Sequence, residues 1–288
     1  MYPQADHVQF VENGYDDLVV IIDETYALRF PRHAGALARS QFERDILQDL
    51  EHHDFGAVAV PRLLGSHENP RYLITSFVPG QTLTPAFIRR LPRPAQQTLA
   101  EDIAQFTFEL HNALSVDRVK QIRERFGLEG QEEDPWEVYF ERLLLRAVLP
   151  TRQQDAVAKE YYERWSQIVP TAKQIMLHDD LHTENMLFKG NRLSGVLDFG
   201  DTNIGSPEQE LRQLYRINDA ITVWAAKAYG KLSGQDLDPN IIRIWAITQE
   251  LSTYSERLQA GSTDHPAFHT PAAPPAAPVS ACMSRASW

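Results

Sequence analysis

The residues best suited to chemistry lie close together in the second half of the chain. His178, Asp180 and Asn185 follow the order H-x-D-x-x-x-x-N, and Asp198 opens an Asp-Phe-Gly segment a short way further on. Apolar runs precede and separate them, with a turn at 189–191. We therefore expect hairpins whose strand ends bring Asp180, Asn185 and Asp198 together. Their oxygens suit Mg²⁺, which binds one or two carboxylates and completes its shell with water and nucleotide phosphates.

Phosphoryl transfer gives each of these side chains a separate task. One aspartate orients or deprotonates the attacking hydroxyl, while an asparagine and a second aspartate hold the metal ions that neutralise the transferring phosphoryl group. The alternative is two hairpins with solvated acidic turns. The complete spaced pattern is much rarer than its parts, so it favours phosphoryl transfer.

The pattern resembles the catalytic and metal loops of the aminoglycoside phosphotransferase family, kinase-like enzymes that phosphorylate hydroxyl groups of small molecules. The resemblance implies that Asp180 is the catalytic base and that His178 braces the loop. It also implies that Asn185 and Asp198 bind Mg²⁺.

Four positions depart from the family pattern. Asp179 stands where a small glycine is usual, and Arg29 where a lysine is commoner. Ser206 replaces an aspartate, and Glu210 stands in the position of an aspartate early in the next helix. If the carboxylates of Asp179 and Asp180 approach each other, their like charges raise the proton affinity of one of them. If Asp179 points outward, the cost is small.

The N-terminal part of the chain predicts strands followed by a helix. Apolar runs place the strands at 8–11, 18–22 and 25–30, and an apolar stripe places the helix between 35 and 50. By resemblance, Arg29 on the third strand binds the nucleotide phosphates through its planar fork. Glu43 on the helix would pair with Arg29 and orient it. The alternatives are an edge-strand arginine that extends to solvent and two surface charges on unrelated faces.

The apolar strand at 71–78 ends at Pro79-Gly80, a strong turn signal. By resemblance, the backbone at Ser76 and Val78 hydrogen-bonds the purine edge of ATP or GTP, and a hinge near 77–82 separates two lobes. We expect an α+β, bilobal, protein-kinase-like fold with a small antiparallel-sheet N-lobe and a larger, mostly helical C-lobe. The expected divisions are an N-lobe at 1–78, a C-lobe at 79–260 and a disordered, Pro- and Ala-rich tail at 261–288.

The larger lobe is predicted to be built from helices. Apolar stripes at helical spacing place them at 99–110, 157–168, 211–224 and 244–258. Ser206-Pro207 also predicts a helix start, with Ser as N-cap and Pro as the first helical residue. The segment at 132–137 combines acids with Trp136, which would suit either an ammonium group or a solvated loop.

Composition limits the partners of the protein. The chain has 288 residues, of which 43% are hydrophobic and 23% charged, and a formal net charge of −11. That charge argues against nucleic acid, whose phosphates need Lys and Arg, and favours cationic substrates, although acidity also serves solubility alone. The one cysteine, Cys282, permits no internal disulfide and favours a reducing compartment. Without a secretory pattern or a long apolar run, we expect a soluble cytoplasmic protein that binds no membrane.

These observations predict a phosphotransferase that moves the γ-phosphoryl of ATP or GTP to a hydroxyl of a small cationic molecule, with Mg²⁺ as cofactor. An aminoglycoside is the first candidate, which would connect the protein with antibiotic resistance. Macrolides, choline-like alcohols and a metabolite are alternative acceptors. A hypothesis from another class is a catalytically weak nucleotide-binding protein on the same fold, motivated by Asp179, Arg29 and Ser206.

Overall fold

The computed structural model describes residues 5–12, 16–68, 71–128, 136–146, 149–168, 173–259 and 261. Apart from Gly261, the predicted tail at 261–288 lies outside the described residues, as do the acids at 132–134. The chain folds into two compact units. Unit 1 comprises residues 1–133 and 171–243, and unit 2 comprises residues 134–170 and 244–288.

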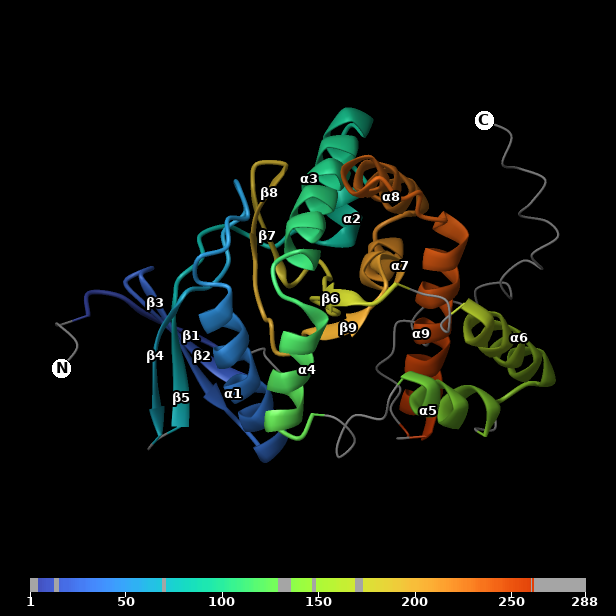
Figure 1. Ribbon diagram of the computed structural model, residues 1–288, viewed down its shortest axis with the longest axis horizontal. Helices are drawn as coiled ribbons and strands as arrows, with labels where there is room; N and C mark the ends of the chain where they lie inside the picture. The colour runs from blue at the N-terminus through green and yellow to red at the C-terminus, as the bar shows by residue number, and fades with distance from the viewer. Residues whose placement is uncertain are drawn as a thin grey trace. The chain divides into compact units, whose positions relative to one another are not determined.

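Unit 1 begins with a five-stranded antiparallel sheet in the order β1-β2-β3-β5-β4 (Figure 1). Its strands are β1 (Val8–Val11), β2 (Asp17–Ile22), β3 (Tyr26–Pro31), β4 (Leu63–Glu68) and β5 (Arg71–Ser76). Helix α1 (Ala34–Asp49) packs on β3, β4 and β5. His33 caps this helix, because its Nδ1 accepts a hydrogen bond from the Ala36 N–H at 3.1 Å.

The β2–β3 hairpin closes through two residues in the left-handed region. Asp23 has φ 50° and Glu24 has φ 46°, and Thr25 N–H donates to the Ile22 carbonyl at 2.9 Å. Positive φ at both central residues is typical of a type I′ turn, whose twist matches that of paired strands. This two-residue turn joins the strands predicted at 18–22 and 25–30, and it fixes the register that places Arg29 opposite Val19.

The remainder of unit 1 is mainly helical, with two small sheets. Its helices are α2 (Pro85–Ile88), α3 (Arg93–His111), α4 (Val116–Arg125), α7 (Pro207–Glu210) and α8 (Asp219–Ser233), together with the 3₁₀ helix η3 (Leu211–Arg216). Helices α3 and α8 lie side by side (Figure 1). A continuous apolar core runs from α1 through α3 to α8 and includes Phe42, Phe106, Phe188 and Phe199.

The two small sheets differ in part from the predicted hairpins. β7 (Met186–Lys189) and β8 (Arg192–Val196) form the expected hairpin, with Gly190 at φ 61° in its turn. β6 (Ile175–Leu177) pairs with β9 (Asn203–Gly205), not with β7. The prediction of a β6–β7 hairpin is therefore wrong. The stretch between these strands forms a loop held by side-chain hydrogen bonds, and β6 finds its partner after the Asp198 segment.

The single helix expected at 211–224 is also interrupted. The 3₁₀ helix η3 ends at Arg216, and α8 starts after Asn218, whose side-chain oxygen accepts the Ile221 N–H at 2.8 Å. An asparagine that caps a new helix competes with continuation of the previous one. The predicted N-cap at Ser206 is confirmed, because its hydroxyl accepts the Gln209 N–H at 3.2 Å and Pro207 starts α7.

Unit 2 contains α5 (Trp136–Phe140), the π-helical turn η1 (Glu141–Leu145), α6 (Arg152–Ile168) and most of α9 (Pro239–Gln259). Its interior holds an aromatic cluster of Trp136, Phe140, Trp165 and Trp245, with Trp165 4.8 Å from Phe140 and 5.3 Å from Trp245 between ring centroids. Trp136 therefore belongs to an aromatic cluster, while most of the segment 132–137 lies outside the described residues. The antiparallel sheet and the many helices confirm the α+β class, and no described helix is long and apolar enough to span a bilayer.

Candidate active site

Asp180 is held by two neighbours in the loop between β6 and β7. Asn185 Nδ2 donates to both the carbonyl and Oδ2 of Asp180 at 3.0 Å, and His182 Nε2 lies 3.2 Å from the same Oδ2. The Asp180 side chain is 30% exposed, so it is fixed in direction yet accessible to a small molecule. Burial lowers the pKa of His182, but the adjacent Asp180 carboxylate outweighs this effect and raises it.

His178 ties this loop to the Asp198 segment. Its Nε2–H donates to the Leu197 carbonyl at 2.9 Å, and its Nδ1 accepts the Asp180 N–H at 3.3 Å. Both ring nitrogens are therefore used, one as a donor and one as an acceptor, and the ring is fixed between the two segments. The ring also packs edge-on against Phe199, with centroids 4.9 Å apart. His178 thus lies where a brace between the two loops would be needed.

Arg29 lies among three carboxylates. Its Nε donates to Asp17 Oδ2 at 2.7 Å, its Nη1 lies 2.6 Å from both oxygens of Glu43, and its Nη2 donates to Asp198 Oδ1 at 3.2 Å. Glu43 is fully buried and also accepts the Phe199 N–H at 3.1 Å. The structure therefore brings Arg29 and Glu43 together, and the same guanidinium reaches Asp198.

Burial and charge act in opposite directions on these carboxyl groups. Burial raises the pKa of Glu43 to about 7 and also raises the pKa of Asp17, in both cases against the effect of Arg29. Loss of hydration raises the pKa of Asp198 as well, but Arg29 and His178 outweigh it and the net pKa is lowered. Asp198, whose φ is 64°, is therefore the carboxylate that keeps its charge most readily.

Asn185 and Asp198 have the chemistry expected of magnesium ligands. The Asn185 amide nitrogen is used on Asp180, which leaves the amide oxygen as the atom for a cation. The Leu197 N–H donates to the Asn185 carbonyl at 2.9 Å, so the two segments adjoin, and the Asp198 side chain is 43% exposed. Among the described residues no three His, Cys, Asp or Glu side chains are grouped to hold a metal. Nucleotide phosphates and water would have to complete an octahedral shell.

The backbone after β5 leaves polar groups free at Val78. Ser76 N–H donates to the Arg62 carbonyl at 2.9 Å, and Ser76 Oγ accepts the Arg62 N–H at 2.9 Å. Within the described part of the chain, neither the N–H nor the carbonyl of Val78 makes a hydrogen bond. The Val78 side chain packs on the backbone of β8, where a Cβ added to Gly195 would lie 2.6 Å from Val78 Cγ1. Such a close approach requires glycine.

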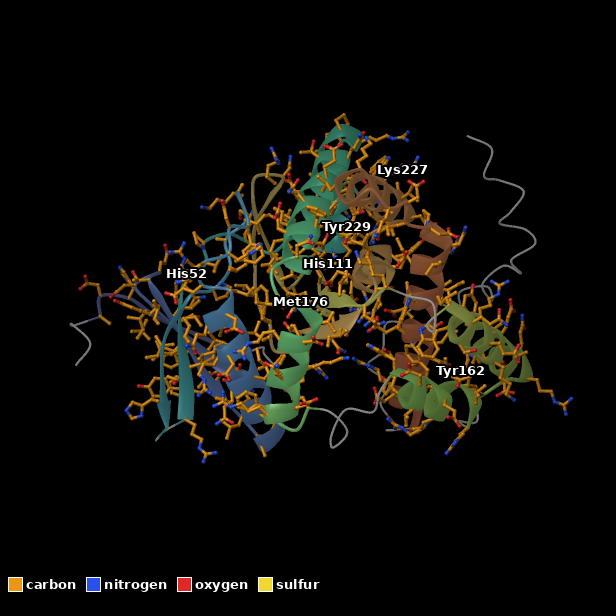
Figure 2. The ribbon with its side chains drawn as sticks, viewed as in Figure 1. His52, His111, Tyr162, Met176, Lys227 and Tyr229 are labelled. Carbon is orange, nitrogen blue, oxygen red and sulfur yellow. The ribbon has the colours of Figure 1, made fainter. Side chains whose placement is uncertain are left out.

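Glu210 supports the loop between β6 and β7 through two backbone amides. Its Oε2 accepts the His178 N–H at 2.6 Å, and its Oε1 accepts the Asp179 N–H at 3.2 Å. His111 Nε2 lies 3.4 Å from Oε2, and Tyr229 Oη lies 2.8 Å from His111 Nδ1. Figure 2 labels His111 and Tyr229, which belong to α3 and α8. A glutamate here thus reaches the loop amides.

Asp17 and His182 were not singled out from the sequence. Asp17 and Arg29 are diagonal neighbours on paired strands, because Val19 lies opposite Arg29, and long side chains can bridge that distance. The signal that could have found this pair is the two-residue turn, because the turn fixes the register of the two strands. His182 follows Asp180 by two residues, but no spacing rule indicated that its ring would turn back to the carboxylate.

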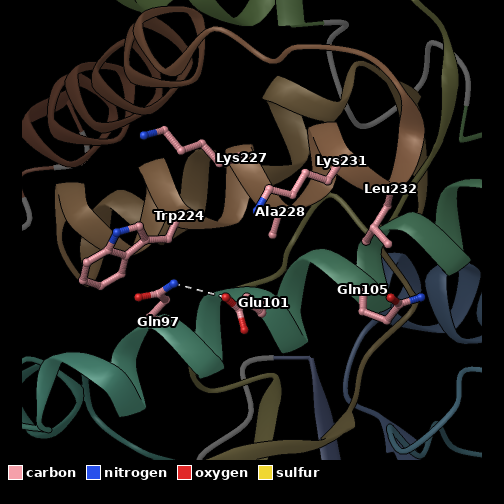
Figure 3. A pocket seen from close by; sticks show the side chains of 8 residues that line it. All are labelled: Gln97, Glu101, Gln105, Trp224, Lys227, Ala228, Lys231 and Leu232. Carbon is pink, nitrogen blue, oxygen red and sulfur yellow. Dashed lines mark hydrogen bonds between the residues drawn. The ribbon is translucent and has the colours of Figure 1, made fainter.

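A hollow of about 290 Å³ lies apart from these residues, between α3 and α8 (Figure 3). It is lined by Gln97, Glu101, Gln105, Trp224, Lys227, Ala228, Lys231 and Leu232. Gln97 donates to Glu101 at 3.3 Å across one turn of α3. None of the lining residues belongs to the Asp180 loop or the Arg29 cluster, so the hollow is a separate surface feature.

A sheet of five antiparallel strands, a helix that supplies a glutamate to a strand arginine, and separate Asp/Asn and Asp-Phe-Gly loops define the protein-kinase-like fold. The model of the phosphotransferase enzyme family (APH) matches residues 7–245. The chain therefore belongs to the phosphotransferase enzyme family.

Solved structures show the same fold. The GDP complex of wild-type aminoglycoside 2'-phosphotransferase-IIIa matches with a TM-score of 0.75 at 19% identity, over 92% of this chain and 89% of that one. The streptomycin–ATP–APH(2")-IIa ternary complex matches with a TM-score of 0.68 at 19% identity, over 89% and 86%. Macrolide 2'-phosphotransferase MphH from Brachybacterium faecium matches with a TM-score of 0.63 at 20% identity, over 94% and 92%.

Proposed function

We propose that this protein transfers the γ-phosphoryl group of ATP or GTP to a hydroxyl of a small cationic molecule. The observation that carries the proposal is the position of Asp180. Its carboxylate is partly exposed and held by Asn185 and His182, and the loop that bears it is tied by His178 to the segment of Asp198. A fixed, accessible carboxylate beside an oxygen-rich cation site is what a hydroxyl acceptor and a nucleotide require.

Each residue of the site has a task in this proposal. Asp180 orients the acceptor hydroxyl and takes its proton, while Asn185 holds the Asp180 carboxylate in place through its amide nitrogen. Arg29, oriented by Glu43, directs its remaining N–H toward the nucleotide phosphates. Mg²⁺, when bound with nucleotide at Asn185 and Asp198, supplies positive charge to the phosphoryl oxygens.

The purine site and the division into lobes complete the proposal. The free N–H and carbonyl of Val78 supply a donor and an acceptor for a purine edge, with the Ser76 carbonyl beside them. We place the hinge after residue 78, with an N-lobe at 1–78 and a C-lobe at 79–260. The proposed compartment is the reducing cytoplasm, since the chain has one cysteine.

An aminoglycoside is the first acceptor to test. Structures similar to this chain contain streptomycin, gentamicin and kanamycin, and the net charge of −11 favours a cation. A macrolide is the second candidate, because macrolide 2'-phosphotransferases share the fold. The competing function is nucleotide binding without turnover, which the departure at Asp179 and the crowded environment of Arg29 favour.

The deciding experiment measures nucleoside-diphosphate release with Mg²⁺ and ATP or GTP across aminoglycosides, macrolides and amino alcohols. We expect acceptor-dependent release by the wild type and a loss of about 10²–10⁴-fold in Asp180→Asn, with nucleotide binding retained. Asp236→Asn removes the same charge at an exposed position and should behave as wild type. Nucleotide binding without release on any acceptor would favour the binding protein, and full turnover in Asp180→Asn would refute the assignment of the base.

A further inference from the structure

The residue before the proposed base adopts a conformation that is costly for a side chain. Asp179 has φ 65°, in the left-handed region that glycine enters without strain. Aspartate tolerates this region better than most residues do, because its short side chain can bond nearby polar groups. The strain persists only if the surroundings fix the residue.

Every polar group of Asp179 is bound. Its Oδ1 accepts from Gln209 Nε2 at 2.9 Å and Arg212 Nη1 at 2.6 Å, and its Oδ2 accepts from Asn203 Nδ2 at 3.0 Å. Its carbonyl accepts from Arg212 Nη2 at 2.7 Å, and its N–H donates to Glu210 at 3.2 Å. The partners all come from the segment 203–212, so Asp179 fastens the loop to β9, α7 and η3.

Arg212 and Asp179 form a buried ion pair. The side chains are 2% and 5% exposed, and Arg212 Nη1 also donates to the Gln209 carbonyl at 2.7 Å. Two charges removed from water depend on each other, because the loss of either leaves the other buried and uncompensated. The guanidinium grips both the side chain and the backbone of one loop residue, and this contact limits rotation of the peptide that leads into Asp180.

Asp179 is not a second base. Its oxygens bond Gln209, Arg212 and Asn203, whereas the Asp180 carboxylate contacts Asn185 and His182, so the two acids share no side-chain partner. The side chains thus turn to separate environments. The remaining role for Asp179 is mechanical: it fixes the residue from which the base projects.

The geometry points to Asp179 and Arg212 as positioning residues that aim the Asp180 carboxylate at the acceptor hydroxyl. The inference rests on the proposed function for its catalytic readout, but not for its structural one. A purely structural pair would stabilise the fold and leave turnover per folded molecule unchanged. A positioning pair affects the chemical step more than nucleotide binding.

The first test compares two buried aspartates. Asp179→Asn is expected to lower kcat about 10²-fold and to change the nucleotide KM by no more than about twofold. Asp45→Asn is the matched control, because Asp45 on α1 is also 6% exposed and also accepts from arginines, namely Arg44 and Arg125. The control should lower the Tm without lowering kcat. Equal kcat losses in both variants would overturn the inference.

A second test separates positioning from the cost of burying charge. Asp179→Gly relieves the backbone strain but strands the Arg212 guanidinium, and Arg212→Leu strands the carboxylate, so each lowers the Tm. The double variant Asp179→Gly/Arg212→Leu removes both charges and should regain most of the Tm, while kcat stays low. Recovery of kcat together with Tm would show that each charge only compensates the cost of burying the other. That result would overturn the inference.

A spectroscopic readout tests the pair without any turnover. The rings of His178 and His182 contact the Asp180 backbone and carboxylate, so their ¹⁵N signals report its orientation. In the double variant these signals should shift, whereas in Asp45→Asn they should not. If the wild type turns over no acceptor, the proposed function fails, yet shifted signals still support positioning. Unshifted signals in a folded double variant overturn the inference whatever the turnover.

Discussion

At Arg29, three carboxylates compete for one guanidinium. Asp17 and Glu43 take its Nε and Nη1, and Asp198 takes part of Nη2. One positive charge against three negative charges leaves the cluster anionic when all are ionised. The carboxylates therefore repel the phosphates of a nucleoside triphosphate that approaches Arg29, and a divalent cation at Asp198 would offset this repulsion.

We predict that Asp17→Asn tightens nucleotide binding. Asp17 is 5% exposed, burial raises its pKa, and its Oδ1 has no hydrogen-bond partner among the described residues. Removing this charge should free Arg29 for phosphate and strengthen binding by about 1 kcal/mol, or about fivefold, most clearly without Mg²⁺. Calorimetric titration with ATP and GTP measures the change.

Asp16→Asn is the control for this effect. Asp16 is the adjacent residue, but its carboxylate pairs with Arg39 and His33 and not with Arg29. The Asp16→Asn variant removes the same charge as Asp17→Asn and should alter nucleotide affinity less. If both variants tighten binding equally, the effect is one of net charge and not of the Arg29 cluster.

At the scale of elements, strand β8 fits against the segment after β5 with no space for a side chain. The added Cβ of Gly195 would lie 2.6 Å from Val78 Cγ1, whereas that of Gly65 on β4 would meet its nearest atom at 3.8 Å. Neither glycine has a positive φ, so the two positions differ in space and not in backbone strain.

Gly195→Ala should displace Val78 and weaken purine binding. Overpacking of this kind costs about 1–3 kcal/mol of stability. The same displacement should reduce nucleotide affinity about tenfold if Val78 contacts the purine, which a fluorescent-nucleotide titration would measure. Gly65→Ala, its counterpart on β4, should leave both quantities near wild type. Unchanged affinity in Gly195→Ala would argue against the assignment of Val78.

Glu210, which accepts the amides of His178 and Asp179, makes the stability of the protein depend on pH. Burial raises its pKa, but His111 and His178, together with the His178 N–H, outweigh this and lower it below 4.5. The unfolded chain then binds this proton more readily than the folded protein, so the stabilisation is present above pH 4.5 and is lost as the pH falls through the folded pKa.

Glu210→Gln should therefore flatten the acid limb of the stability curve. At neutral pH the variant should be less stable by about 2 kcal/mol, because hydrogen bonds to a charged acceptor are lost. The difference between variant and wild type should shrink below about pH 4.5. Urea midpoints between about pH 3 and 7 measure it, and parallel curves at all pH values would contradict the prediction.

Local patterns predicted most elements, and the misses share a cause. Helices and the strands of the first sheet follow from apolar periodicity. The hairpin at Asp23 follows from the two-residue gap between its predicted strands. The pairing of β6 with β9 depends on contacts distant in sequence, and Asn218 interrupts a stripe that remains apolar on both sides. The pairing depends on hydrogen bonds between distant segments, which no local pattern carries, whereas the break depends on a local cap that the apolar stripe does not reveal.

The site divides in the same way. The Asp180 loop was predictable because its spacing is specific, and the Arg29–Glu43 contact because the resemblance implied it. The partners of Asp179 were not predictable, since Arg212 lies 33 residues away and its direction depends on the start of α7. A charge in the usual place of a glycine was the one visible signal.

At the scale of the whole molecule, the chain has two cores. Every residue proposed for the nucleotide site belongs to unit 1, and the cluster around Trp165 belongs to unit 2. Each unit is expected to lose stability through its own interior, because deletion of a buried aromatic ring leaves a local cavity.

Trp165→Ala should destabilise unit 2 by about 3–5 kcal/mol and leave magnesium–nucleotide affinity near wild type. Trp165 is 1% exposed, so the cavity left by the missing indole ring would be closed to solvent. Chemical denaturation gives the first quantity and calorimetric titration at low temperature the second. A parallel loss of nucleotide affinity would show that the two interiors are energetically coupled.

Amide hydrogens in a turn exchange rapidly with solvent unless a buried acceptor holds them. The amides of His178 and Asp179 both end on the carboxylate of Glu210, which is 1% exposed. Their deuterium uptake should be slow for a segment outside regular structure. Since both are released only when the loop leaves Glu210, their exchange rate would time the opening of the catalytic loop.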